Sequence, residues 1–484
     1  MKARWCFSAR GVPALWFAAQ LMLSCATNPV TGKKEFSLLS ESDEIRLGAE
    51  ADRGIVAQYG LYDDPEVAEY VSDLGQRMAE ISHRPHLEWH FRVLDSPVVN
   101  AFALPGGYIY MTRGILAYLN SEAELAGVMG HEIGHVTARH GAAAYTRAQL
   151  AQVGLTAGYV LSETFRRFGD IAETGIGLLF LSFSRSQESQ SDELGVQYAT
   201  ALGYDAREMS RFFATLDRMA EKRGQALPSF LSTHPNPEDR EVRTLRLAEA
   251  AQQDAGQKKF IKARERYLSK IEGLVFGEDP RQGFVEGGYF YHPTLDFQFP
   301  VPEKWEVVNT PQAVLMSNPE EDAAIQFSLA TQKGAQAAAE AFVANSQAQV
   351  RRSHATRVHG FETVVVESQV TGKNQVLAVL SYFIEKGGRV FVFHGFTTPA
   401  RYATYVQTFS HVMNQFDRLR SAAAKRKKPM RVKIVRVTKG GTLKQVLQRY
   451  GGVKISLKDL ALINGMELTD TVRAGQQIKV LRAY

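Results

Sequence analysis

The stretch that most constrains this chain is residues 121–141, which reads as one helix carrying the pattern His-Glu-x-x-His. Ser121 with Glu124 three residues later is the capping-box pattern that opens a helix, and Gly141 is a suitable stop. Apolar residues recur between these ends at helical spacing, namely Leu125, Val128, Met129, Ile133 and Val136. The sequence therefore predicts a helix with one apolar face and another that carries ionisable side chains.

Three side chains of this helix have the types and spacing found in zinc hydrolases. His131 and His135 are four residues apart, so both imidazoles project from one face at a separation that one metal ion can bridge. Glu132 lies beside them, where its carboxylate can act on a water at the metal without being a ligand. Gly130 and Gly134 each cost about 1 kcal/mol in a helix interior, so we expect another backbone to approach this face. Paired histidines also occur on ordinary surface helices, so a third ligand is needed to distinguish a zinc site from such a surface.

A second helical stretch, residues 184–199, offers that ligand. Glu188 and Asp192 are four residues apart and therefore share a face. Glu188 would supply the third ligand, and Asp192, one turn later, can accept the remaining N–H of a ligating histidine and fix its tautomer. Acidic pairs on helices are more often simply solvated, so spacing alone leaves both interpretations open.

Several motifs together resemble metallopeptidase family 48, the gluzincins that include the CAAX prenyl proteases and periplasmic proteases of the BepA type. The resemblance covers about residues 26–250. Its motifs stand in family order: Asn100-Ala-Phe-x-x-Pro-Gly-Gly107, His131-Glu-x-x-His-Val-x-x-Arg-His140, Ser184-Arg-x-x-Glu188-x-x-x-Asp192-x-x-Gly195, Gly203-Tyr-Asp205, and Thr233-His234-Pro235 with Arg240. The resemblance implies one Zn²⁺ per chain, held by His131, His135 and Glu188, with Glu132 as the catalytic base.

Two other histidines need separate roles. His140 comes five residues after His135, which places it off the ligand face, so we expect it to be structural. His234 lies in a proline-rich loop, where a histidine is usually exposed, but the resemblance places the matching residue near the zinc. There it would either act in catalysis by donating a hydrogen bond to the oxyanion, or hold the site closed as a removable ligand.

Residues 100–110 predict the strand that binds substrate. Tyr108 begins a short strand, and Gly106 and Gly107 form a turn at which a backbone can approach closely. Zinc proteases pair an edge strand beside the active helix with extended substrate, so Asn100, Gly106, Gly107 and Tyr108 are the predicted substrate-binding residues. The alternative is an ordinary hairpin strand.

The first 24 residues are typical of a signal peptide, with a positive amino end and an apolar run, residues 12–23, that is short for a bilayer span. The run ends in Met22-Leu23-Ser24-Cys25, which resembles a bacterial lipobox with Met where Leu is usual. The resemblance implies lipidation of Cys25 at the start of a tether over residues 25–40. Ala26 in the next position points to the periplasmic side of the outer membrane. A plain secretory signal with an incidental cysteine is the alternative.

Length and charge limit the classes of protein to which this chain can belong. A chain of 484 residues is long enough for about three domains, and 22 % charged residues is ordinary for a globular protein. The net charge of +6 comes from Lys and Arg that are spread along the chain, so no nucleic-acid partner is expected. The apolar stretch 142–183 is predicted as two buried helices, since neither half reaches the length of a membrane span. A membrane-dipping segment is the alternative.

The expected fold class is multidomain. Residues 41–275 are predicted as a mainly α zincin-type metallopeptidase domain with a small β-sheet, and residues 285–418 as an α+β accessory domain with a mostly antiparallel sheet. A basic linker, residues 419–430, precedes a small βααβ domain over residues 431–484. This last segment resembles a LysM domain, a module that binds glycans containing N-acetylglucosamine, although Gly441 stands where that pattern usually has Asp.

The sequence and its resemblances together predict a zinc metalloendopeptidase of the bacterial cell envelope. Its expected substrates are unfolded or misfolded envelope proteins, and its other expected partners are the outer membrane, through the lipid anchor, and peptidoglycan. Two alternatives stay open. One is a zinc-stabilised periplasmic chaperone or assembly factor with little proteolysis, and the other is a peptidoglycan-binding envelope protein.

Overall fold

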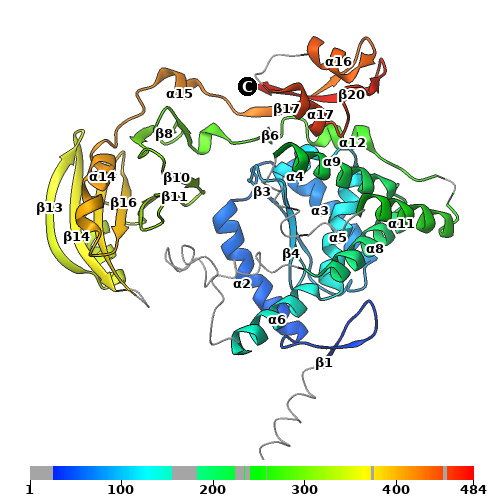
Figure 1. Ribbon diagram of the computed structural model, residues 1–484, viewed down its shortest axis with the longest axis horizontal. Coiled ribbons are helices and arrows are strands. Elements are labelled where there is room, and N and C mark those ends of the chain that lie inside the picture. The colour runs from blue at the N-terminus through cyan, green and yellow to red at the C-terminus, as the bar shows by residue number, and fades with distance from the viewer. Residues whose placement is uncertain are drawn as a thin grey trace, which may run out of the picture. The chain divides into compact units, whose positions relative to one another are not determined.

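The computed structural model describes residues 25–154, 183–223, 230, 234, 240–257, 259–371, 375–450 and 455–484. The predicted signal peptide and most of the apolar stretch 142–183 lie outside these residues. The chain divides into two compact units (Figure 1): one comprises Met1–Val56, Leu61–Leu274 and Val432–Arg482, and the other Ala57–Gly60, Val275–Arg431 and Ala483–Tyr484. Within the described ranges, we find no helix whose length and apolar content would let it cross a membrane.

The first unit contains the predicted metal helix, α5 (Glu122–Thr137), in a mainly helical domain. The Ser121 hydroxyl accepts the N–H of Glu124 at 3.1 Å, as a helix cap does. The Glu124 carboxylate accepts the N–H of Asn120 at 2.6 Å, one residue before the position that a capping box predicts. The other helices of this domain are α2 (Glu41–Tyr59), α3 (Pro65–Glu80), α4 (Arg113–Tyr118), α6 (His140–Gly154), α8 (Arg185–Ala201), α9 (Arg207–Arg223), α11 (Arg240–Asp254) and α12 (Arg264–Lys270).

The predicted end of the metal helix at Gly141 is wrong. Helix α5 stops at Thr137, and α6 begins at His140. Between them Arg139 has φ of 57°, a left-handed backbone conformation that interrupts the helix. The metal helix is also buried along its whole length, so its ionisable face is enclosed by protein rather than open to solvent.

The close approach predicted at the helix glycines is confirmed, and the approaching backbone is that of α8. A Cβ atom added to Gly130 would lie 3.0 Å from the Cα of Gly195, and one added to Gly134 would lie 3.3 Å from the Cα of Ser191. In return, a Cβ on Gly195 would lie 3.0 Å from the carbonyl oxygen of Gly127. The backbones of α5 and α8 therefore meet at Gly130 and Gly195, while Gly134 also packs against the Leu194 side chain.

A three-stranded sheet lies beside α5. Its strands are β3 (His90–Leu94), β4 (Ala101–Leu104) and β5 (Tyr108–Thr112), in the order β3-β5-β4. Strand β5 is therefore central, parallel to β3 and antiparallel to β4, with both edges hydrogen-bonded. The prediction that the strand beginning at Tyr108 is the edge strand is wrong, and β4 occupies that edge.

The segment predicted as a tether is folded onto the domain. Strands β1 (Cys25–Thr27) and β2 (Lys34–Phe36) form an antiparallel hairpin. The Asn28 amide donates to the carbonyl oxygen of Ala138 at 3.1 Å, and the N–H of Leu38 donates to the Thr146 hydroxyl at 3.1 Å. This hairpin thus contacts the turn that follows the metal helix.

The second unit is the predicted α+β domain with an antiparallel sheet. Seven strands pair in the order β10-β11-β12-β16-β15-β14-β13, with α14 over one face and α13 over the other. The elements are β6 (Val275–Phe276), β7 (Phe284–Glu286), β8 (Tyr289–His292), β9 (Phe297–Pro300), β10 (Glu306–Asn309), β11 (Ala313–Ser317), β12 (Ala323–Leu329), α13 (Ala335–Ser346), β13 (Gln349–Val358), β14 (Phe361–Thr371), β15 (Val376–Lys386), β16 (Arg389–Thr397), α14 (Tyr402–Asn414) and α15 (Ala422–Arg426).

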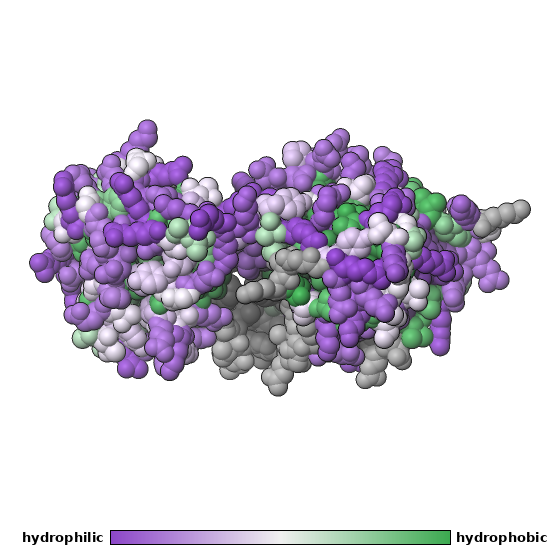
Figure 2. Space-filling model, turned by 90° about the horizontal axis from the view of Figure 1, so that it is seen from above, coloured by the Kyte–Doolittle hydropathy of each residue, from purple (hydrophilic) through white to green (hydrophobic). Residues whose placement is uncertain are grey.

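The carboxyl-terminal segment has the predicted strand, helix, helix, strand order. It consists of β17 (Met430–Arg436), β18 (Gly441–Thr442), α16 (Leu443–Arg449), α17 (Leu457–Ile463), β19 (Thr471–Val472) and β20 (Gln477–Ala483). Strand β20 pairs with β17. The face of the molecule in Figure 2 is mostly hydrophilic, as a charged content of 22 % predicts.

Candidate metal centre

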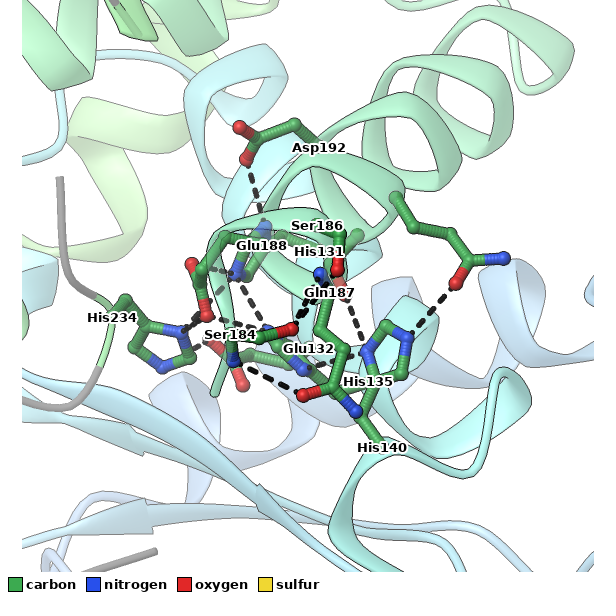
Figure 3. A network of polar contacts seen from close by, with 12 residues as sticks. His131, Glu132, His135, His140, Ser184, Ser186, Gln187, Glu188, Asp192 and His234 are labelled. Atoms are coloured by element: carbon green, nitrogen blue, oxygen red, sulfur yellow. Dashed lines mark hydrogen bonds and ion pairs between the residues drawn. The ribbon is translucent and has the colours of Figure 1, made fainter. Parts of the chain in front are cut away.

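Four buried side chains converge next to the sheet. One ligand atom from each of His131, His135, Glu188 and His234 lies within 4.8 Å of the others. Helix α5 supplies the first two and α8 supplies Glu188, as Figure 3 shows. Because α5 and α8 meet at their glycines, the predicted histidines and carboxylate point toward one another across a short gap.

The donor atoms form a compact group. The Nε2 atoms of His131 and His135 are 3.0 Å apart, and the Glu188 oxygens lie 3.5 Å from the first and 3.4 Å from the second. Two imidazoles and a carboxylate are a donor set that suits zinc. Oε2 of Glu188 and both oxygens of Glu132 are buried and accept no hydrogen bond from the described residues. Buried anionic oxygens left in this state are costly, so the group fits a bound cation.

His131 is held by an ion pair behind it. Its Nδ1 lies 2.9 Å from Oδ1 of Asp192. Arg240 donates to the same carboxylate at 2.6 Å, and Arg243 also pairs with it. Burial alone would raise the pKa of Asp192, but Arg240 and His131 more than offset it, and the net shift is downward. Asp192 therefore stays ionised and leaves Nε2 of His131 free to bind a metal.

His135 has a different partner, which the sequence did not predict. The Nδ1 atoms of His135 and His140 are 3.1 Å apart, and Nε2 of His140 lies 3.0 Å from Oε1 of Gln190. Burial lowers the pKa of His140 to about 4, so this imidazole is neutral. In that form His140 can donate to Gln190 and accept the Nδ1–H of His135, which directs Nε2 of His135 to the metal position. His140 is thus not in the ligand group but orients one of its members.

Glu132 lies beside the four ligand side chains without joining them. Both of its oxygens are buried, and the nearer one is 3.5 Å from Nε2 of His234. Burial raises the pKa of Glu132 above its ordinary value, while His234 and His131 oppose that shift. A carboxylate with a raised pKa is suited to accept and return a proton near neutral pH.

The backbone of His234 is hydrogen-bonded to that of Phe230. Its N–H donates to the carbonyl oxygen of Phe230 at 2.8 Å, and the N–H of Phe230 donates to that of Val99, just before β4. The ring of Phe230 stacks on His234 at 4.6 Å. Nδ1 of His234 then lies 3.0 Å from Oε1 of Glu188 and 3.3 Å from Nε2 of His131. Nδ1 of His234 therefore lies among the donor atoms of the group.

The predicted substrate-binding residues lie within the packing of the domain. A Cβ on Gly106 would lie 2.7 Å from the Cα of Ile45, and one on Gly107 would lie 2.7 Å from the carbonyl oxygen of Glu88. The backbone that approaches these glycines is therefore the protein's own and not that of a substrate. Tyr108 stacks on His90 at 4.4 Å, and the N–H of Asn100 donates to the Thr112 hydroxyl.

Sequence reasoning missed one residue at the centre and gave no role to another. Phe183 stacks on the ring of His135, with centroids 4.0 Å apart. Arg240 was identified only as part of a motif, yet it is buried, pairs with Asp192 and lies 4.1 Å from the Phe213 ring centre. An apolar residue in an apolar stretch gives no signal for the first. For the second, only its place beside the His234 motif pointed to the site.

Comparison with known proteins identifies two regions. Residues 65–247 match the model for Peptidase family M48, and residues 435–481 match that for the LysM domain. The chain is 31 % identical over 227 residues to the Beta-barrel assembly-enhancing protease of Escherichia coli, covering 45 % of this chain and 46 % of that protein. It is 31 % identical over 222 residues to the Mitochondrial metalloendopeptidase OMA1 of Schizosaccharomyces pombe, covering 44 % and 63 %.

The matches include the metal group but cover only part of each relative. The Escherichia coli protein extends well beyond the aligned region, because the chain spans less than half of its length. The metal group, His131 to His234, lies inside the matched residues 65–247. The resemblance expected from the motifs is thus confirmed for both regions: residues 65–247 match Peptidase family M48, and residues 435–481 match the LysM domain.

Proposed function

We propose that this protein is a zinc-dependent endopeptidase of the bacterial cell envelope. The observation that carries the proposal is the convergence of His131, His135 and Glu188 from two helices, with Glu132 beside them and outside the ligand group. A structural zinc site has no use for a free carboxylate beside its ligands, whereas a catalytic site needs one to act on the attacking water.

The proposed mechanism assigns one task to each residue. His131, His135 and Glu188 would hold the ion, which when bound supplies Lewis acidity toward water and the scissile carbonyl. Glu132 removes a proton from the attacking water and returns it to the leaving amine nitrogen. Asp192 and His140 keep the two imidazoles in the tautomers that this arrangement needs.

His234 and the sheet edge define where substrate would enter. We assign His234 as a fourth ligand in the arrangement described, because its Nδ1 lies among the donor atoms. Substrate binding would then require His234 to withdraw. Among the described strands, β4 is the edge of the sheet beside α5, so extended substrate would pair there by main-chain hydrogen bonds rather than on β5.

The cellular setting follows from the amino-terminal sequence and the relatives. The lipobox-like Met22-Leu23-Ser24-Cys25 supports a signal peptide over residues 1–24 and a lipid anchor on Cys25 at the periplasmic side of the outer membrane. One similar protein is named for enhancing β-barrel assembly, which supports unfolded or misfolded envelope proteins as substrates. The LysM domain supports peptidoglycan as a further partner.

The test of this proposal is Glu132→Gln in the purified mature protein. General acid–base groups contribute about 10²–10⁴-fold, so casein cleavage should fall by that factor while zinc content stays at that of the wild type. Glu193→Gln removes an exposed carboxylate from α8 and is the matched control, which should cleave normally. Cleavage retained by the Glu132 variant would refute the assignment.

The same variant separates an enzyme from a chaperone. If the protein acts by proteolysis, Glu132→Gln will fail to restore envelope integrity in cells that lack the wild-type gene. Full restoration by the inactive variant would instead favour a zinc-stabilised assembly factor.

A further inference from the structure

A buried lysine joins the LysM domain to the peptidase domain within the first compact unit. Lys479 lies in β20 and has an exposed fraction of 0 %. Lysine is almost never fully buried unless its ammonium group is bound. Here it donates to the carbonyl oxygens of Ala117 and Leu119, each at 2.7 Å. Both acceptors belong to the peptidase domain, so this side chain crosses between the two domains.

The two acceptors lie at the end of α4. The last carbonyl groups of a helix have no partner inside the helix and need a hydrogen-bond donor from elsewhere. Lys479 therefore caps α4 from outside the peptidase sequence. Without it, two buried carbonyl oxygens would lose their hydrogen-bond donor, which costs more than the loss of an exposed contact.

The LysM domain presents this lysine in a fixed position. The Asn464 amide accepts the N–H of Lys479 at 2.8 Å and donates to the carbonyl oxygens of Lys479 at 2.8 Å and Leu460 at 2.7 Å. Asn464 follows α17 directly, so it ties that helix to β20. The lysine is thereby held in place by its own domain.

The capped helix leads directly into the metal helix. The residue after Leu119 is Asn120, whose N–H donates to Glu124 in the first turn of α5 and whose carbonyl oxygen accepts from Arg264 at 2.8 Å. Ser121 then caps α5. Only the turn 119–121 separates the lysine contact from the helix that carries His131 and Glu132.

Two further contacts hold the LysM domain against the peptidase domain near this turn. A Cβ on Gly465 would lie 2.9 Å from Nδ2 of Asn120, so the turn after α17 packs closely on the turn before α5. Arg218 of α9 pairs with Glu467 at 2.8 Å. The contact therefore includes a buried centre and an ion pair at its rim.

We propose that Lys479 is a positioning residue for the metal helix, and that the docked LysM domain is a working part of the peptidase rather than a freely attached wall-binding module. The inference rests on the proposed function. Capping α4 fixes the turn from which α5 starts, and this sets His131 and Glu132 against Glu188 on α8.

The primary test is Lys479→Met in the full-length mature protein, which keeps a side chain of similar length and removes the hydrogen-bond donor. We expect kcat on a fluorogenic casein peptide to fall roughly tenfold with KM within about twofold of wild type, since no substrate contact is changed. Amide hydrogen exchange at Glu124 and Leu125 should quicken to a similar extent. Lys458→Met alters an exposed lysine of α17 and should change neither quantity.

The rim ion pair provides a second test if Lys479→Met does not fold. Glu467→Arg places two arginines together and should lower kcat about twofold, and adding Arg218→Glu should restore it. Wild-type kcat and exchange in a folded Lys479→Met, or no effect of Glu467→Arg where only that variant folds, would overturn the inference. Failure of the proposed function would appear differently, as no cleavage by the wild type; the exchange measurement would then still decide the positioning role.

Discussion

Replacing Asp192 by Asn tests the support behind the metal ligands. The substitution keeps the shape of the side chain and one oxygen for Nδ1 of His131, which lies 2.9 Å away. It removes the negative charge that accepts from Arg240 at 2.6 Å and also pairs with Arg243. The substitution should therefore weaken metal binding and lower the stability of the fold.

The expected magnitudes follow from these contacts. Loss of a hydrogen-bonded group behind a metal ligand costs about 10–100-fold in metal affinity, or roughly 1.4–2.8 kcal/mol. Breaking a buried ion pair costs about 3–5 kcal/mol. We expect the lower end, because the guanidinium of Arg240 also lies 3.3 Å from Glu188. For a domain of this size, about 3 kcal/mol lowers the Tm by about 6–12 °C.

Zinc affinity measured against a competing chelator and calorimetric unfolding would report the two effects separately. Asp205→Asn is a suitable control, because Asp205 is also buried and pairs with Arg207 at 2.7 Å, but outside the metal group. It should lower stability and leave zinc affinity unchanged. If Asp192→Asn binds zinc within about twofold of the wild type, the role assigned to this carboxylate is refuted.

Two more predictions concern packing and pH. Gly195→Ala would place a Cβ 3.0 Å from the carbonyl oxygen of Gly127 and from the N atom of His131. The variant should therefore lose about 1–3 kcal/mol of its free energy of unfolding in urea. Wild-type stability would contradict close packing of α8 on α5. In the second unit, burial lowers the pKa of His394, 2.8 Å from Ser381, to about 4, so the folded state favours the neutral ring. The free energy of unfolding should be highest above pH 6.5 and fall by up to about 1.4 kcal/mol per pH unit toward pH 4. In His394→Phe the urea midpoint should depend less on pH. Equal pH dependence in the two proteins would exclude this histidine as the cause.

Local patterns in the sequence predicted much of the catalytic domain. The helical spacing of residues 121–141 placed His131 and His135 on one face, and the motif order paired them with Glu188. The α+β domain over residues 285–418 was also predicted, but the end of its helix α13 at Ser346, where Gln347 has φ of 50°, was not.

The relations that sequence spacing could not supply are those between distant segments. The turn at Gly106 and Gly107 predicts two strands but not which one is at the edge, because sheet order depends on where β3 pairs. His140 looked structural because it is off the ligand face, and its contact with His135 depends on the break at Arg139.

Lys479 shows the same limit in the LysM domain. It stands between Ile478 and Val480, where strand alternation predicts an exposed side chain. The structure buries it because another domain covers that face of β20. Contacts of this kind arise from domain packing, which no local pattern records.

The central claim is that His131, His135 and Glu188 hold one zinc ion. The most direct measurement is X-ray absorption of the purified mature protein at the zinc edge, combined with metal stoichiometry of the wild type and Glu188→Ala. We predict one zinc per chain, surrounded by nitrogen and oxygen donors at about 2.0–2.2 Å with no sulfur, and loss of that zinc from the variant after dialysis. Wild-type protein without zinc, or full zinc retention with an unchanged donor shell in Glu188→Ala, would contradict the claim.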